Sequence, residues 1–350
     1  MRILTIAPQP FFQPRGTPFS ELYRARALTE LGHEVDMVTY PIGEDVEMAG
    51  LRILRAPRIP GVHRVRIGPS LVKVPLDALV FLSSLKRLLT NRYDLLDCHE
   101  EAGIMGVLLG WLFSVPVVYD MHSSLPEQLS NFQYSRNRIL RALFDWTERA
   151  TIKGSDAVIV VCPYLKDVVY GIDREKPCFL IENSPLAESG EEVTEEEVRR
   201  IRRELGLEGA FVIHYSGTFE AYQGLPLLYE ALRLLAEKLP SARLLLVGGT
   251  AVQVEDAKID VERRGIGGRV VFTGQRSPSE MPGFLAVSDA LVSPRSSGTN
   301  TPLKVYSYLR AGKPIVATRL LTHTQVLDDE SAVLTEPTPE AFADAILALA

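Results

Sequence analysis

The stretch SPRSSGTNTPLKVYSYLRAGKPIVAT, from Ser293 to Thr318, reads as a strand end, a small polar loop, a short helix and a second strand. We expect Thr301 to cap the helix and Pro302 to take its first position, because proline there gives up no hydrogen bond. Gly312 is predicted to close the helix in a left-handed conformation, with a proline two residues later as a stop. Strand, loop, helix and strand in this order predict one unit of an α/β fold with a parallel sheet.

The loop before this helix, from Ser296 to Thr301, contains only serine, glycine, threonine and asparagine. Its backbone and hydroxyl donors would lie at a helix N-terminus, an arrangement that favours phosphate, and Lys304 adds a positive charge. The first expected strand, Ile3–Ala7, leads to a similar helix start at Thr17. Gly16, just before it, would let a ligand approach the backbone. One such start in each half predicts an anionic ligand held between two domains.

Apolar runs of strand length alternate with helix-like segments along most of the chain, which predicts doubly wound parallel sheets. The expected strands are Ile3–Ala7, Val35–Tyr40, Leu51–Leu54, Leu95–Cys98, Val115–Tyr119, Ala157–Val161 and Phe179–Ile181, then Phe211–Tyr215, Arg243–Val247, Val270–Phe272, Ala290–Ser293, Ile315–Ala317 and Ala332–Leu334. The acidic stretch from Glu182 to Glu197 separates the two sets. Glu195 lies four residues before Arg199, which predicts an exposed helix start rather than an acidic tail. We therefore expect two Rossmann-like domains, residues 1–184 and 185–350, facing a central cleft.

Length and composition agree with that division. The 350 residues are 46% hydrophobic and 23% charged, with a formal net charge of −6, as in soluble globular proteins. Cys98, Cys162 and Cys178 have neither metal-ligand spacing nor disulfide density, and the first residues do not form a signal peptide, so a cytoplasmic location is expected. The apolar run 102–118 is expected to form a helix and a buried strand rather than a membrane span. The chain ends within an expected helix, 339–350, which predicts that the second domain continues further or has been cut there.

One segment departs from the overall negative charge. Between Arg52 and Arg92 lie nine basic residues and one acid, Asp77, a local balance of +8. The segment is also rich in aliphatic residues, and a basic amphipathic helix can bind an anionic membrane surface. An ordinary helix that packs its apolar face on the sheet explains the pattern equally well, so both interpretations stay open. Nucleic-acid binding is not expected, because no aromatic-basic platform or reading motif accompanies the charge.

Several blocks, in this order and spacing, resemble the GT-B glycosyltransferases of family 4, the glycosyl transferases of group 1. The blocks are PRGTPFSE, YDMHSS after a buried strand, HYSGTFEAYQG at the start of the second half, RLLLVGG, VVFTGQ and TPLKVYSYLRAGKPIVAT. The resemblance covers essentially the whole chain. It implies a retaining, metal-independent hexosyltransferase of glycan biosynthesis that uses a nucleotide-diphosphate sugar as donor substrate and no cofactor. The second domain is then expected to bind the donor and the first domain the acceptor, which is a glycan, a lipid-linked sugar or a small molecule.

The resemblance also implies roles for single residues. His122 matches the family histidine beside the transferred sugar, and Lys304 is expected to stabilise the leaving diphosphate; these are the predicted catalytic residues. His99 and Glu100 are predicted acceptor contacts, His99 by position only. The predicted donor-binding residues are Gly16, Thr17, Gly217, Thr218, Gln223, Gln275, Arg295, Gly298, Thr299, Asn300, Thr301, Pro302, Leu303 and Ser307. No metal ligands are predicted, and the other four histidines, His33, His63, His214 and His323, are expected to be structural.

The chain departs from the family pattern at the donor site. Many members carry two glutamates eight positions apart in the last block, and here these positions are Thr299 and Ser307. An arginine and a lysine that often contact the diphosphate are also replaced, by Thr218 and Gln223. Arg295 and Lys304 are the expected replacements, and one subgroup of the family has the same Thr-Pro-Leu-Lys sequence.

Two other classes of function stay open. A sugar-nucleotide epimerase of the same fold would need acid–base carboxylates at the sugar, for which Glu100, Glu101 and Asp120 are the candidates. A non-catalytic GT-B binding partner would bind the nucleotide sugar without turnover, which the replaced charges allow. A nicotinamide-dependent dehydrogenase is not expected, because the first strand–helix loop lacks the G-x-G-x-x-G pattern.

Overall fold

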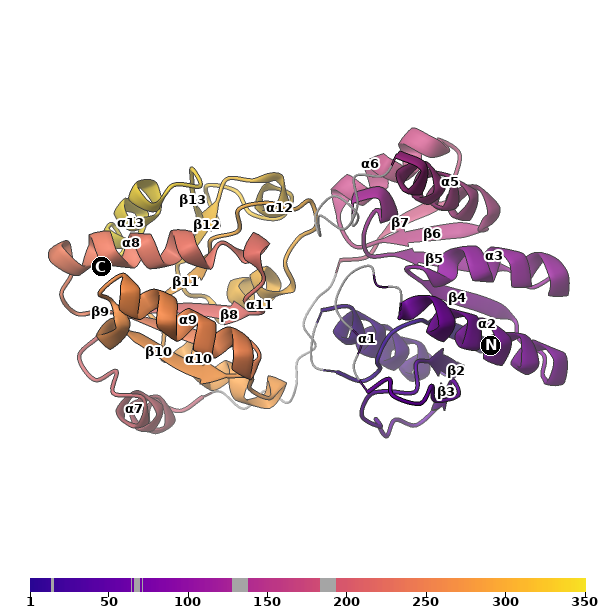
Figure 1. Ribbon diagram of the computed structural model, residues 1–350, viewed down its shortest axis with the longest axis horizontal. Coiled ribbons are helices and arrows are strands. Elements are labelled where there is room, and N and C mark those ends of the chain that lie inside the picture. Colours follow the sequence, from indigo (N-terminus) through magenta and orange to yellow (C-terminus); the bar gives the residue numbers. More distant parts are fainter. Residues whose placement is uncertain (14–15, 64, 66–69, 71, 128–137, 183–192) are drawn as a thin grey trace. The chain divides into compact units, whose positions relative to one another are not determined.

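The computed structural model describes residues 1–350 apart from 14–15, 64, 66–69, 71, 128–137 and 183–192. The chain divides into two compact units, unit 1 (residues 1–183) and unit 2 (residues 184–350) (Figure 1). Each unit is built around one parallel sheet covered by helices on both faces.

The sheet of unit 1 has seven parallel strands in the order β3-β2-β1-β4-β5-β6-β7. They are β1 (Arg2–Ala7), β2 (Glu34–Thr39), β3 (Leu51–Arg55), β4 (Leu95–His99), β5 (Val117–Met121), β6 (Ala157–Val160) and β7 (Cys178–Leu180). The chain leaves β1 toward β2 and leaves β4 toward β5, in opposite directions across the sheet. The carboxyl ends of β1 and β4 therefore form a switch point, the place where open α/β sheets bind ligands.

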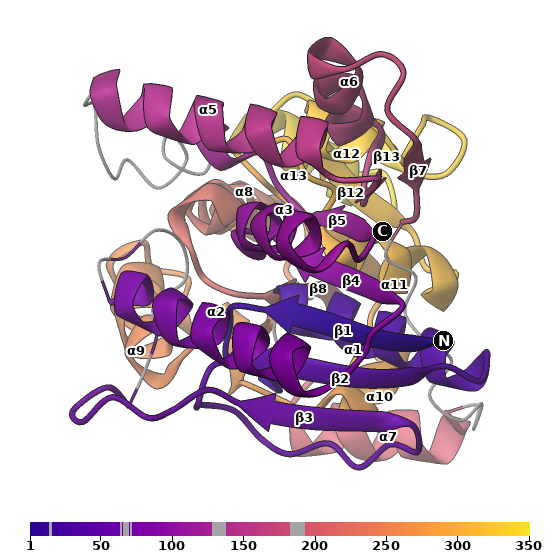
Figure 2. The same ribbon diagram turned by 90° about the vertical axis from the view of Figure 1, so that its right-hand side faces the viewer.

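Helices cover both faces of this sheet. Helix α1 (Gly16–Glu30) lies on one face, and α2 (Lys73–Thr90), α3 (Ala102–Phe113) and α5 (Arg138–Gly154) lie side by side on the other, with α6 (Pro163–Ile172) next to α5 (Figure 2). Successive residues of β2 serve the two faces, because side chains alternate along a strand. Met37 packs with Leu22 of α1, and Val38 packs in the cluster that contains Leu76 of α2.

Three glycines bring α3 unusually close to its neighbours. A Cβ atom on Gly106 would lie 2.2 Å from the sulfur of Cys98 in β4, and one on Gly110 would lie 2.3 Å from Val117 of β5. A Cβ atom on Gly103 would lie 2.4 Å from a methyl group of α5. This close contact fixes the end of β4 at His99 and the turn that begins at Glu100 and leads to α3.

The sheet of unit 2 has six parallel strands in the order β10-β9-β8-β11-β12-β13. They are β8 (Phe211–Gly217), β9 (Ala242–Gly248), β10 (Val270–Gly274), β11 (Ala290–Ser293), β12 (Ile315–Thr318) and β13 (Val333–Thr335). The order reverses between β8 and β11, so this sheet also has a switch point at the carboxyl ends of two adjacent strands.

The helices of unit 2 pack on the two faces of this sheet in separate apolar clusters. They are α7 (Glu195–Glu204), α8 (Leu225–Lys238), α9 (Ala251–Arg263), α10 (Met281–Ala286), α11 (Leu303–Ala311), α12 (Leu321–Thr324) and α13 (Pro339–Leu347), with 3-10 turns at Ala221–Gln223, Gly267–Arg269 and Pro278–Glu280. Gly224, before α8, has φ 75°, and a Cβ atom there would lie 1.8 Å from the backbone oxygen of Pro294. Only glycine allows the β8–α8 connection to lie this close to the end of β11.

The structure confirms the predicted α/β class with two parallel sheets, and each strand lies within two residues of its expected position. Strand β5 begins at Val117 rather than Val115, because the Val115 N–H bonds to the oxygen of Gly110 and ends α3. Helix α11 begins at Leu303, so the prediction of Thr301 as cap and Pro302 as first residue was wrong: the extended backbone of Pro302 (ψ 132°) makes it the cap. Gly312 ends this helix with φ 63°, as predicted.

Two further expectations are confirmed. Helix α7 begins at Glu195 behind the cap Thr194, and Arg199 pairs with Glu195 at 2.8 Å. The run 102–118 forms helix α3 and the start of β5, and none of the helices in the described part of the chain is both long and apolar enough to cross a membrane. The three cysteines form no disulfide.

Candidate functional site

Two cations of unit 2, Arg295 and Lys304, lie at the carboxyl edge of its sheet. Lys304 is in the first turn of α11. Its Nζ donates to Oε1 of Gln223 at 3.1 Å and lies 3.8 Å from the centroid of the Tyr215 ring, a cation–π distance. Gln223 comes from the β8–α8 connection and Tyr215 from β8, so the switch point positions the ammonium group.

Arg295 follows β11 by two residues and holds the loop that leads to α11. Its Nη1 donates to the backbone oxygen of Asn300 and to the hydroxyl of Thr322, both at 2.9 Å. Its guanidinium lies over the ring of Tyr222, 5.3 Å from the centroid. The guanidinium is thereby fixed in place by neutral groups.

Within the described part of the chain, no ion pair joins either of these cations to a carboxylate. Burial, and then the charge of Arg295, lowers the pKa of the Lys304 ammonium well below its usual value, and burial also lowers the pKa of Arg295. The buried Nε of Arg295 and the buried hydroxyl of Thr301 have no hydrogen-bond partner among the described residues. Two cations with neutral neighbours and spare donors make a binding site for an anion. We call Arg295 and Lys304 the cation pair.

Glycines lie against both members of the cation pair. A Cβ atom on Gly217, at the end of β8, would lie 3.1 Å from Nζ of Lys304, and one on Gly298 would lie 3.4 Å from Nη1 of Arg295. Both glycines have positive φ, 143° and 115°. Side chains at these positions would crowd the two cationic groups.

The loop between β11 and α11 is held from the other side by β12 and α12. The hydroxyl of Thr318 donates to the backbone oxygen of Arg295 at 2.7 Å. The side-chain amide of Gln325 donates to the backbone oxygen of Thr299 at 2.6 Å. The structure thus groups most of the predicted donor residues, namely Gly217, Thr218, Gln223, Arg295, Gly298, Thr299, Asn300, Thr301, Pro302 and Leu303. The buried His323, bonded to the hydroxyl of Ser293 at 2.8 Å, supports this loop structurally.

Other predicted donor residues lie elsewhere. Gln275 is exposed after the edge strand β10, which β9 separates from β8. Ser307 lies one turn after Lys304 on α11 and is partly exposed. Gly16 and Thr17 belong to unit 1, where they begin α1.

A second cluster, which we call the histidine cluster, lies in unit 1 at the carboxyl ends of β4 and β5. Its members are Glu21 and Arg24 of α1, Asp97 and His99 of β4, and Asp120 and His122 of β5 and the turn after it. Oδ2 of Asp120 lies 3.1 Å from Nδ1 of His99 and 3.1 Å from Nε2 of His122. The same oxygen is 3.0 Å from the Arg24 guanidinium. Asp97 lies 3.0 Å from the other side of the His99 ring.

This arrangement favours protonated histidines. Burial favours neutral imidazole, but Asp97 and Asp120 outweigh it and raise the pKa of His99 to about 9. Burial also opposes the charged form of His122, yet Asp120 raises its pKa. Burial opposes ionisation of Asp120 in turn, but Arg24 and the two imidazoles hold its pKa well below the usual range. The cluster is a buried network of alternating charges that fixes the rings of His99 and His122.

The atoms that His99, Asp120 and His122 could offer to a metal ion all lie within 4.8 Å of one another. Imidazole nitrogens and a carboxylate suit several divalent metals. However, Arg24 already places a cation on the same carboxylate oxygen, and the raised pKa values of both histidines oppose the neutral form that binds metal. The donor set therefore fits a proton network better than a metal ion.

The predicted acceptor contacts differ in position. His99 is 1% exposed and lies between Asp97 and Asp120, and His122 is 7% exposed. Glu100 has φ 50°, rare for a residue with a side chain, and accepts a bond from the Ser123 hydroxyl at 2.9 Å. Burial raises the pKa of Glu100 to about 7. Of these, Glu100 and His122 are better placed than His99 to contact a ligand.

Sequence reasoning missed Glu21 and Arg24. Their spacing of three places both on one face of α1, a pattern too common in exposed helices to mark a site. Only the way α1 lies across the sheet brings Arg24 to Asp120 and Glu21 to within 3.7 Å of His99.

Four of the basic residues in segment 52–92, Arg52, Arg55, Lys73 and Arg87, form ion pairs within unit 1. Arg52 and Arg87 both pair with Asp36, at 2.6 and 2.8 Å, and Lys73 pairs with Glu101 at 3.0 Å. Helix α2 buries its apolar face against the sheet. Arg64 and Arg66 lie outside the described residues, and membrane contact through this segment stays a prediction.

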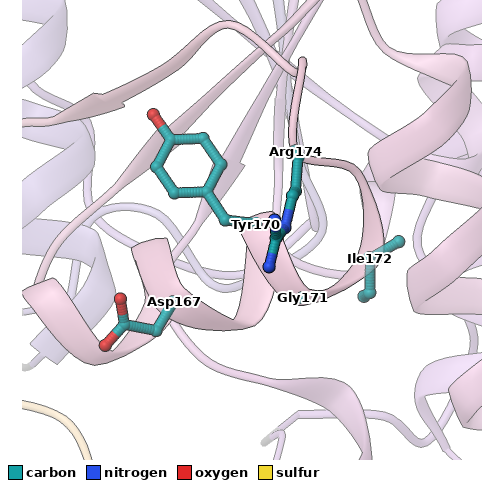
Figure 3. A pocket seen from close by; sticks show the side chains of 5 residues that line it. All are labelled: Asp167, Tyr170, Gly171, Ile172 and Arg174. Atoms are coloured by element: carbon teal, nitrogen blue, oxygen red, sulfur yellow. The ribbon is translucent and has the colours of Figure 1, made fainter.

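A surface hollow of about 410 Å³ lies at the end of α6 in unit 1 (Figure 3). It is lined by Asp167, Tyr170, Gly171, Ile172 and Arg174. Figure 3 shows the three polar side chains pointing in different directions. The hollow lies near the start of β7, at the amino edge of the sheet, so it is not part of the histidine cluster.

Both halves of the chain match known sequence families. The family described as "Glycosyl transferases group 1" matches residues 210–350, and the family described as "Glycosyl transferase 4-like domain" matches residues 22–180. Sulfoquinovosyl transferase SQD2 of Arabidopsis thaliana is 25% identical over 323 residues, 90% of this chain and 59% of the plant protein. The phosphatidyl-myo-inositol mannosyltransferase of Mycolicibacterium smegmatis is 24% identical over 357 residues, 97% of this chain and 82% of the bacterial protein.

Solved structures show the same fold. The crystal structure of HepE from Anabaena in complex with UDP superposes with a TM-score of 0.72, covering 99% of this chain and 89% of that one, at 18% identity. The two parallel sheets described above are thus the two halves of a GT-B fold.

Proposed function

Because the chain belongs to the group 1 glycosyltransferases of the GT-B fold, we propose that it transfers a sugar from a nucleotide-diphosphate sugar to an acceptor hydroxyl, with retention at the anomeric carbon. Unit 2 holds the donor and unit 1 the acceptor. The mycobacterial relative is a phosphatidyl-myo-inositol mannosyltransferase, whose name indicates a lipid acceptor, and this supports a lipid-linked acceptor for the present chain.

One observation carries the proposal: the cation pair has no carboxylate counter-charge in the described part of the chain, at the switch point of unit 2. A diphosphate supplies the missing negative charge and accepts bonds from Lys304, Arg295 and the loop amides. Lys304 belongs to the sequence Thr-Pro-Leu-Lys, and we propose that it replaces the charged residues that many relatives use on the diphosphate. The replaced glutamate positions, Thr299 and Ser307, leave only neutral contacts to the nucleoside.

We propose that the cation pair also stabilises the leaving group of the reaction. The bond between the anomeric carbon and the phosphate oxygen breaks, and the diphosphate leaves with added negative charge. Fixed cations stabilise that charge without reorganisation, and we propose that they do so without a divalent metal. The acceptor oxygen then bonds to the anomeric carbon on the same face, and its proton passes to the leaving phosphate.

Unit 1 contributes the histidine cluster. Protonated His122, held by Asp120, donates a hydrogen bond to a sugar hydroxyl, and Glu100 accepts one from the acceptor. His99 acts as a positioning residue, because it is buried and holds Asp120 from the other side.

Incubation of the protein with UDP-, GDP- and ADP-sugars, with and without glycan and lipid-linked acceptors, tests the proposal. Release of nucleoside diphosphate that depends on the acceptor is expected, with the anomeric configuration kept in the product. Lys304→Met should abolish release, while Lys258→Met, at an exposed lysine of α9, should not. An isomerised donor would indicate an epimerase, and donor binding without turnover would indicate a non-catalytic partner; either result contradicts the proposal.

A further inference from the structure

Helix α5 of unit 1 exposes an apolar stripe on its outer side. Ile139, Leu143 and Trp146 are 80%, 53% and 61% exposed. Their spacing of four and three residues places them on one face of the helix. The stripe is continuous over two turns, unlike the single apolar residues that normally lie on protein surfaces.

This stripe is opposite the side of α5 that packs on unit 1. The buried residues of the helix are Glu148, Thr151 and Ile152. Glu148 accepts a bond from the Leu125 N–H at 2.9 Å, which fixes the inner side of the helix. The fold therefore uses one side of α5 for its own core and leaves a second, apolar side outward.

Basic residues flank the stripe. Arg138, Arg149 and Lys153 are exposed, and at 100° per residue all three lie on the same side of it. The acids of this helix are Asp145, which is partly buried, and Glu148, which is buried. The outer side of α5 thus combines apolar residues with a positive edge.

The neighbouring helix α3 adds a second exposed apolar group. Gly103 and Gly154 bring α3 and α5 into close contact. On α3, Leu108, Trp111 and Leu112 are exposed, and Trp111 reaches 80%. Figure 2 shows both helices in the outer layer of unit 1. The chain contains two tryptophans, and both lie in this layer.

We propose that the outer face of α5 docks on an anionic lipid bilayer, with Trp146 at the level of the lipid headgroups. Tryptophan prefers the boundary between hydrocarbon and water, and arginine and lysine beside an apolar stripe bind acidic headgroups. A second copy of this chain is a poorer occupant, because two such faces would bring their arginines together. The proposal is independent of sugar transfer, since it concerns a surface on unit 1 alone.

The variant Trp111→Phe leaves Trp146 as the single tryptophan, so its fluorescence reports on α5 alone. Vesicles of phosphatidylcholine and phosphatidylglycerol should shift its emission to shorter wavelength, and lipids with brominated acyl chains should quench it. Vesicles of phosphatidylcholine alone should give a much smaller shift, and added salt should weaken binding.

Matched variants separate docking from folding. Arg149→Glu should weaken vesicle partitioning more than about fivefold, since each basic residue near an anionic surface contributes about that factor. Leu143→Glu should weaken it at least about tenfold. Ile259→Glu, at a 51% exposed position on α9 of unit 2, should leave it unchanged, and all variants should keep the wild-type melting temperature. Unchanged Trp146 emission with anionic vesicles, or a lipid-independent dimer that Leu143→Glu dissociates, would overturn the proposal.

Discussion

Replacement of Lys304 by methionine removes the charge of the ammonium group and keeps most of the side-chain volume. In the empty protein this charge has a bond to Gln223 at 3.1 Å, worth about 1 kcal/mol, and a contact with the Tyr215 ring, worth about 0.5 to 2 kcal/mol. Against these stands the desolvation of a cation beside Arg295, which costs several kcal/mol. Lys304→Met should therefore leave the empty protein as stable as the wild type or about 2 kcal/mol more stable.

Lys304→Met should have the opposite effect on ligand binding and reduce the stabilisation that a bound nucleoside diphosphate provides. A charge-assisted bond to a phosphate contributes about 1.5 to 3 kcal/mol, so its loss should weaken nucleoside diphosphate binding about 10- to 150-fold. At 100 times the wild-type Kd, the ligand stabilises the wild type by about 2.7 kcal/mol. The same concentration should stabilise Lys304→Met by only about 0.3 to 1.4 kcal/mol.

Chemical denaturation of both proteins, with and without UDP, GDP and ADP, measures all four free energies of unfolding. Lys258→Met on α9 is the control and should match the wild type under every condition. A variant that is clearly less stable when empty, and that keeps the full stabilisation by ligand, would refute the reasoning. This result would mean that Lys304 stabilises the fold and does not bind the diphosphate.

Three further predictions concern protons and packing. The pKa of Lys304 is lowered in the ligand-free protein, and a bound diphosphate should raise it, so diphosphate binding should take up protons and become tighter as pH falls. Calorimetry in buffers of different ionisation enthalpy measures the number of protons taken up, and an uptake of zero contradicts the prediction. The pKa of His99 is about 9 in the folded protein and about 6.5 when unfolded, so its contribution to stability is complete below pH 6.5 and is lost as pH rises toward 9. In Asp97→Asn the free energy of unfolding should fall less between pH 7 and pH 9 than it does in the wild type. An equal pH dependence in both proteins would contradict the raised pKa of His99. Gly106→Ala should lower the free energy of unfolding by about 1 to 3 kcal/mol, because the new Cβ atom would lie 2.2 Å from the Cys98 sulfur. Gly171→Ala, where a Cβ atom would have no neighbour within 4 Å, should leave stability unchanged or raise it slightly. Similar free energies of unfolding for the two variants would contradict the packing of α3.

The strands can be predicted from the sequence because buried parallel strands are short apolar runs between turn residues. Element ends are harder, since they depend on backbone bonds that several residues can make. Proline is typical of the first helical position, but the extended backbone of Pro302 (ψ 132°) makes it the cap instead. Val115 reads as a strand residue but gives its N–H to the end of α3.

Part of the candidate site is also readable from the sequence. The loop 296–301 and Lys304 belong to one continuous stretch, so their proximity follows from chain connectivity. The partners of the cation pair do not follow, because Gln223 reaches Lys304 across 81 positions and Thr322 reaches Arg295 from α12. Arg24 and Asp120 meet only through the packing of α1 on the sheet, which no local pattern encodes.

The central claim is that the cation pair of unit 2 binds the diphosphate of a nucleotide sugar. Calorimetric titration of the protein with a nucleoside, its monophosphate and its diphosphate tests this most directly, for uridine, guanosine and adenosine in turn. For one base, the diphosphate should bind at least about 100-fold more tightly than the nucleoside, because both cations contact phosphate oxygens. A nucleoside that binds as tightly as its diphosphate, or no binding of any diphosphate, would contradict the claim.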